Sequence, residues 1–166
     1  MDIREQVSFR ELVALGVGGT ARYVITVRSA QDAQAAVAFA RDRGLRRAVI
    51  ASGSSVLPSD QGFDGVVLQF LGEPITPRPD RFVYFAGATI QGVGSVGGAV
   101  VDNALINGQP ISSFLSTVTI LTDGGERGTI PADAADFGQG RSHFQTTNGI
   151  LLEVEATLPE IQPIAP

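Results

Sequence analysis

A glycine-rich segment from Gly87 to Gly108 has the residue spacing that most directly suggests a chemical role. It reads GATIQGVGSVGGAVVDNALING, and its Gly92, Gly94 and Gly97 match the pattern G-x-G-x-x-G. In dinucleotide-binding proteins such glycines let backbone N–H groups approach a pyrophosphate at the start of a helix. The same residues are also typical of a tight turn that binds nothing. Both interpretations stay open at this point.

A nicotinamide dinucleotide is one ligand that this spacing predicts. Asp123 ends the strand-like segment STVTILTD, roughly where a ribose-binding acid is expected. The segment after Gly97 contains a further glycine and β-branched residues, which are unfavourable in a helix. A parallel strand order would favour this hypothesis, and an antiparallel second half of the chain would exclude it.

Few other side chains in the chain could do chemistry. It contains no Cys, no Lys and a single His, so it has no thiolate, no Lys phosphate clamp and no Cys- or His-based metal site. His143 stands beside Phe144 with no acid close in sequence, and we interpret it as a surface residue. Glu153 and Glu155 alternate with apolar residues, which predicts the wet face of an edge strand rather than a catalytic pair.

Composition limits the classes of partner. The 166 residues carry a net charge of −5, which argues against nucleic acid and anionic membrane surfaces as partners. The acidic N-terminal residues do not resemble a signal peptide, and no apolar run reaches the roughly 18 residues of a spanning helix. We therefore expect a cytoplasmic protein that does not contact a membrane.

The pattern of apolar residues predicts a βαβ unit followed by a mainly antiparallel sheet. ARYVITV reads as a strand, Ser29 and Asp32 as the start of a helix, Gly44 as its end and RRAVIA as a second strand. The later segments VVLQF, RFVYFAGA, LSTVTILT, GERGTI and GILLEVEATL also read as strands. The turn from Asp123 to Gly125 predicts a hairpin. We predict an α+β fold of two small subdomains at 1–72 and 73–159, with a tail at 160–166.

Four segments occur in the order seen in one known family. They are ALGVGGTARYVITVRSAQDAQAAVAFARDRGL, GSSVLPSDQGFDGVVL, GSVGGAVVDNA and DFGQGRSHF. The chain thus resembles the UDP-N-acetylenolpyruvoylglucosamine reductases, the MurB family of cell-wall enzymes. This resemblance implies a flavoprotein oxidoreductase fold in which FAD lies between the subdomains, with its pyrophosphate held by two glycine-rich loops. The residues implied for FAD binding are Gly53, Ser54, Ser55, Leu57, Gly94, Ser95, Val96, Gly97, Gly98 and Asn103.

The chain departs from the family pattern where the ligands would bind. Leu105 stands where the family has a Gly, so we expect too little space for the flavin ring and weak or absent FAD binding. Gln139 and Gly140 replace a Tyr-Arg pair that polarises substrate, which leaves Arg141 and Ser142 as weak catalytic candidates. We also expect no counterpart of the family's third, substrate-covering domain.

These departures predict a MurB-like protein without reductase activity by itself, with an accessory or binding role related to peptidoglycan synthesis. The alternative is a small FAD-binding oxidoreductase completed by another chain. We expect a homodimer or a cell-wall enzyme as the protein partner, because the family helix absent here would leave apolar surface exposed.

Overall fold

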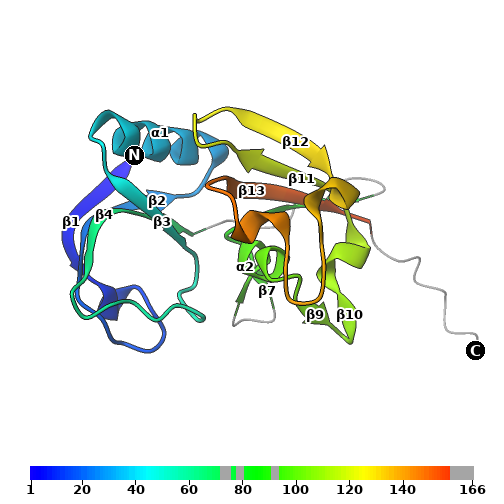
Figure 1. Ribbon diagram of the computed structural model, residues 1–166, viewed down its shortest axis with the longest axis horizontal. Helices are drawn as coiled ribbons and strands as arrows, with labels where there is room; N and C mark the ends of the chain where they lie inside the picture. Colours follow the sequence, from blue (N-terminus) through cyan, green and yellow to red (C-terminus); the bar gives the residue numbers. More distant parts are fainter. Residues whose placement is uncertain (72–75, 78–80, 91–93, 158–166) are drawn as a thin grey trace, which may run out of the picture.

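The computed structural model describes residues 1–71, 76–77, 81–90 and 94–157 of the chain. Figure 1 shows two units side by side, the N-terminal one in blue to teal and the C-terminal one in green to orange. The elements of the first are β1 (Asp2–Ser8), β2 (Thr20–Val27), α1 (Ala30–Asp42), β3 (Arg46–Ile50) and β4 (Phe63–Phe70). Those of the second are β5 (Thr76–Pro77), β6 (Phe82–Phe85), β7 (Thr89–Ile90), β8 (Gly94–Ser95), α2 (Val96–Val101), β9 (Leu105–Ile106), β10 (Gln109–Pro110), β11 (Leu115–Leu121), β12 (Arg127–Pro131) and β13 (Ile150–Ala156).

The first unit is a four-stranded sheet in the order β1-β2-β4-β3. The predicted strand–helix–strand succession of β2, α1 and β3 is confirmed, and β4 lies between the two strands, parallel to both. β4 is a near-continuous apolar run because both of its faces are covered. β1 was not predicted from the sequence, and it pairs antiparallel with β2. β3 is therefore left as one edge of the sheet.

Helix α1 begins where the sequence predicts. The Ser29 side chain accepts a hydrogen bond from the Asp32 N–H (3.1 Å). Burial by itself would raise the pKa of Asp32, but hydrogen bonds from the Ser29 hydroxyl and the Arg28 N–H outweigh it, and the pKa is lowered. Gly44, with a φ of +63°, reverses the chain after the helix. The helix thus presents a stripe of small apolar residues to the sheet.

The second unit is a five-stranded sheet in the order β12-β11-β13-β6-β5, and every neighbouring pair is antiparallel. This confirms the predicted α+β class and the predicted hairpin. The edge-strand prediction for Glu153 and Glu155 is wrong, because β13 lies in the middle of the sheet between β11 and β6. Their carboxylates instead pair on the sheet surface with Arg127 (2.5 Å) and Arg81 (3.2 Å).

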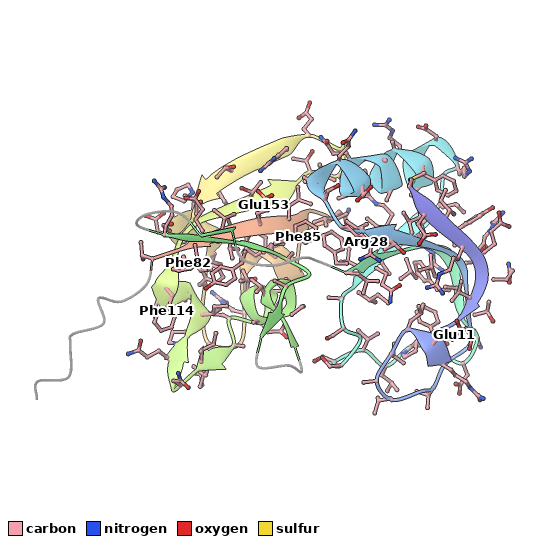
Figure 2. The ribbon with its side chains drawn as sticks, turned by 180° about the vertical axis from the view of Figure 1, so that it is seen from behind. Glu11, Arg28, Phe82, Phe85, Phe114 and Glu153 are labelled. Carbon is pink, nitrogen blue, oxygen red and sulfur yellow. The ribbon has the colours of Figure 1, made fainter. Side chains whose placement is uncertain are left out.

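One hydrophobic core joins the two units. It contains the apolar stripe of α1, side chains of β2 and β4, and side chains of β6, β11, β13 and α2. Phe70 of β4 stacks on Phe85 of β6 with ring centroids 5.4 Å apart, and Figure 2 places Phe85 where the second sheet meets the first unit. A smaller cluster covers the other face of the first sheet. The predicted subdomain boundary at 72–73 and the predicted tail at 160–166 lie outside the described residues.

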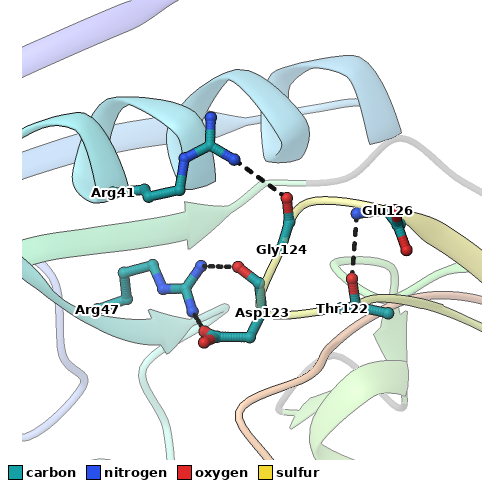
Figure 3. A network of polar contacts seen from close by, with 6 residues as sticks. All are labelled: Arg41, Arg47, Thr122, Asp123, Gly124 and Glu126. Atoms are coloured by element: carbon teal, nitrogen blue, oxygen red, sulfur yellow. Dashed lines mark hydrogen bonds and ion pairs between the residues drawn. The ribbon is translucent and has the colours of Figure 1, made fainter.

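The hairpin between β11 and β12 is held against the first unit by polar contacts (Figure 3). Arg41 of α1 donates to the carbonyl of Gly124 (3.2 Å), and Gln34 donates to that of Gly125 (3.4 Å). Arg47 of β3 pairs with the Asp123 carboxylate. With Asp123 in this ion pair and an antiparallel sheet around it, the structure argues against the nicotinamide hypothesis. Among the described residues, no helix is long and apolar enough to cross a membrane.

Candidate functional site

A groove of about 320 Å³ lies between the loop after β3 and helix α2, which face each other across the space between the two units (Figure 1). We call it the central groove. The loop side contributes residues 49–56, and the opposite side contributes Gly94, Ser95, Gly98, Ala99, Asp102, Ala104, Leu105 and Ile106. Both glycine-rich loops implied by the resemblance therefore border one groove.

Two further cavities continue the central groove along the edge of the first sheet. One, of about 280 Å³, shares Ile50, Ser95 and Gly98 with the central groove and is otherwise lined mainly by apolar side chains. The other, of about 500 Å³, is more polar and includes Arg47 and Asp123. Val49 of β3 borders all three cavities. The edge strand β3 thus forms one wall of an elongated depression between the units.

The loop after β3 is held in place by a glycine. Gly53 has a φ of +68°, and a Cβ there would lie 2.2 Å from the carbonyl oxygen of Leu12. Its own carbonyl accepts a hydrogen bond from the Ala14 N–H (3.1 Å). Ser54 and Ser55 line the central groove, whereas Leu57 does not line it and is 78% exposed.

The glycine-rich segment is built into the fold by its backbone. Gly94 and Ser95 form β8, and the Ser95 side chain caps α2 by accepting from the Gly98 N–H (3.1 Å). The N–H groups of Val96 and Gly97 donate to the carbonyls of Ala88 and Ala86, each at 2.8 Å. Three successive amides that the resemblance assigns to a phosphate are therefore hydrogen-bonded inside the protein. Gly92 lies outside the described residues.

Asn103 connects three parts of the second unit. Its side-chain amide donates to the carbonyl of Gly138 (2.8 Å), and its side-chain oxygen accepts from the N–H of Ser112 (3.2 Å). The residue is 7% exposed and adopts a left-handed φ of +44°. It does not line the central groove. Both polar ends of its side chain are used to hold neighbouring loops.

The two weak catalytic candidates lie outside the central groove. Arg141 is exposed and pairs with Asp136 (3.6 Å). Ser142 is buried, and its hydroxyl donates to the carbonyl of Val101 at the end of α2 (2.6 Å). His143 is exposed next to Phe144. The Ser142 hydroxyl therefore ties its loop to the end of α2, and Arg141 lies on the surface.

The groove fits the diphosphate of FAD poorly. Space is available, since a Cβ at Gly94 would meet nothing within 4 Å, and serine hydroxyls supply hydrogen-bonding groups. No Arg lines the central groove or its apolar extension among the described residues, while Asp102 does line the groove. Leu105, expected to fill the flavin space, is 72% exposed at the margin of the groove. The groove therefore has room for a ligand but lacks positive charge.

Asp102, the one charged side chain among the described residues that line the groove, was not predicted as a site residue from the sequence. It directly follows the last residue of α2 and precedes Asn103, so a signal was present in the segment GGAVVDN. The spacing of glycines and asparagine in this segment does not indicate where an acid between them would lie. Only the position of α2 against the loop after β3 brings Asp102 to the groove.

These features define an α+β protein of two units with a groove between them. The chain is 31% identical to UDP-N-acetylenolpyruvoylglucosamine reductase of Chlamydia felis, over 90% of this chain and 57% of that protein. It is 30% identical to the Rhodopirellula baltica protein of the same name, over 87% of this chain and 55% of that protein. No protein-family model matches. The chain thus spans a little over half the length of these relatives.

Solved structures agree with the sequence comparison. The reductase MurB from Thermus caldophilus superposes with a TM-score of 0.73 and 25% identity, covering 96% of this chain and 64% of that one. Cholesterol oxidase from Brevibacterium sterolicum, at 16% identity and a TM-score of 0.65, shares the fold alone. Over most of its own length, this chain belongs to the MurB family.

We predict that Asn103→Ala lowers the free energy of unfolding by about 2–4 kcal/mol, because it leaves a buried carbonyl and a backbone N–H without their partner. Urea unfolding followed by circular dichroism measures the change. Asn107→Ala is the matched control, since exposed Asn107 also has a left-handed φ, of +51°. Equal losses in the two variants would assign the effect to backbone strain and contradict a role for the Asn103 hydrogen bonds.

Proposed function

We propose that this chain is a MurB-like protein that has no reductase activity by itself and has a binding or accessory role related to peptidoglycan synthesis. Membership of the family supports the link to that pathway. The proposed binding site is the central groove, because it lies between the two units and is bordered by both loops of the resemblance.

The charge of the groove is the observation that carries this proposal. Negative charge develops on the substrate in the transition state of enolpyruvyl reduction, and a cationic side chain beside it would stabilise that charge strongly. Among the described residues of the groove, Asp102 carries the only charge, and it is negative. Arg141 pairs with Asp136 outside the groove, and the Ser142 hydroxyl is bonded to a backbone carbonyl. The described groove residues therefore offer no cation to a substrate.

A flavin-dependent oxidoreductase completed by another chain is the second candidate. The continuity of the three cavities along β3 favours it, because an elongated ligand could occupy such a depression. In this case FAD would supply two-electron redox chemistry, and this chain would supply one binding surface. The poor match of the groove to a diphosphate makes it the less favoured of the two.

The first prediction of this proposal is that the pure protein does not reduce UDP-N-acetylenolpyruvoylglucosamine with NADPH, with or without added FAD. NADPH oxidation is followed by absorbance, with an active MurB enzyme as the positive control. Substrate-dependent turnover by this chain alone would overturn the proposal. Turnover that requires a second chain would establish the second candidate instead.

We also predict that FAD binds this chain more weakly than micromolar and that Leu105→Gly strengthens binding, because the exposed leucine narrows the groove where a flavin ring needs to be enclosed. Calorimetric titration measures both affinities. Leu57→Gly is the matched control, since it removes an equally exposed leucine that does not line the groove. Submicromolar binding by the unmodified protein would show that the steric interpretation of Leu105 is wrong.

We propose a second copy of this chain as the protein partner, in preference to a cell-wall enzyme. Leu105 at the groove margin and Leu57 outside the groove are large exposed apolar side chains, and such surface often marks an interface. Sedimentation equilibrium should give twice the chain mass, and the double variant Leu57→Ser, Leu105→Ser should dissociate. Ile3→Ser on the distant edge strand β1 is the control. A monomeric mass at high concentration would contradict this proposal.

A further inference from the structure

Asp102 occupies a position that helix stability does not explain. It is the residue that ends α2, where its N–H donates to the carbonyl of Gly98 (3.1 Å). A carboxylate near the unpaired carbonyls of a helix end is unfavourable, and basic residues are preferred there. The described residues offer Asp102 no ion pair, and its carboxylate accepts a hydrogen bond from the exposed Gln145 side chain (3.2 Å). No cation among the described residues therefore pairs with this carboxylate.

The same carboxylate borders the central groove opposite a set of hydroxyl groups. Ser52, Ser54 and Ser55 line the side formed by the loop after β3, and Gly98 and Asp102 lie on the side formed by α2. Hydroxyls can donate to or accept from a neutral polar ligand. A phosphate in this groove would instead meet the negative charge of Asp102, with no Lys or Arg among the described lining residues to offset it.

We propose that Asp102 sets the charge preference of the central groove, so that the groove disfavours a phosphorylated ligand and favours a neutral, hydroxyl-bearing one. This inference rests on the proposed function, which makes the groove the ligand site. It goes further by naming the residue and the chemical class of ligand. For flavins, it means that riboflavin, which has no phosphate, binds at least as tightly as FAD.

Titration of riboflavin and FAD into the full chain and into Asp102→Asn tests the inference. The Asn side chain keeps an oxygen to accept the hydrogen bond from Gln145 while removing the charge. One unit charge about 4 Å from another in water changes affinity about five-fold. At low salt we therefore expect Asp102→Asn to bind FAD about five-fold more tightly, with riboflavin affinity unchanged within two-fold. The gain for FAD should shrink as salt screens the charge.

Two control variants separate the local charge from other effects. Asp133→Asn makes the same change in net charge at an exposed site outside the groove, and it should leave FAD affinity unchanged. Asp102→Glu keeps the charge and should bind like the unmodified protein. Equal FAD affinity in Asp102→Asn, Asp133→Asn and the unmodified protein would overturn the inference while leaving the groove as a ligand site. Failure of every variant to bind either flavin would overturn the groove as a flavin site and the inference with it.

Discussion

Burial of apolar side chains between the two sheets is the constraint on which the rest of this structure depends. The stripe of small residues on α1 and the stacked rings of Phe70 and Phe85 belong to one continuous core that draws on both units. Apolar burial stabilises roughly in proportion to the area removed from water, so the units gain from staying in contact. Polar contacts of the β11–β12 hairpin with Arg41 and Arg47 also hold the second unit against the first. The groove lies where this packing ends.

A second constraint is that backbone N–H groups at the start of α2 are already hydrogen-bonded within the chain, which limits what the glycine-rich segment can do. The amides of Val96, Gly97 and Gly98 are satisfied by two carbonyls and the Ser95 hydroxyl. Gly97 is also needed for packing, because a Cβ there would lie 3.0 Å from Ala86. Gly97 therefore lets α2 pack close to Ala86. Because these three amides already donate within the chain, fewer backbone N–H groups are left to bind a phosphate.

Membership of the MurB family favours a flavin in this groove, whereas the charge of the groove disfavours the diphosphate of FAD. The fold retains an interunit depression bordered by both loops, which is the feature that the family likeness implies for a flavin. The charged groups around it differ from what a diphosphate requires, since the described lining of the central groove contributes a carboxylate and no cation. Fold therefore supports ancestry, while the site has to be argued from its own residues.

Local sequence determined the features that depend on neighbours in the chain. The cap at Ser29, the end of α1 at Gly44 and the hairpin at Asp123–Gly125 could all be predicted, because each involves residues a few positions apart. Tertiary structure alone decided that β4 lies between β2 and β3 and that β13 is central, because strand order depends on contacts between distant segments. The same reason applies to the site. Asn103 could be placed in a glycine-rich segment from the sequence, but only the fold turned its side chain to Gly138 and Ser112 and brought Asp102 to the groove.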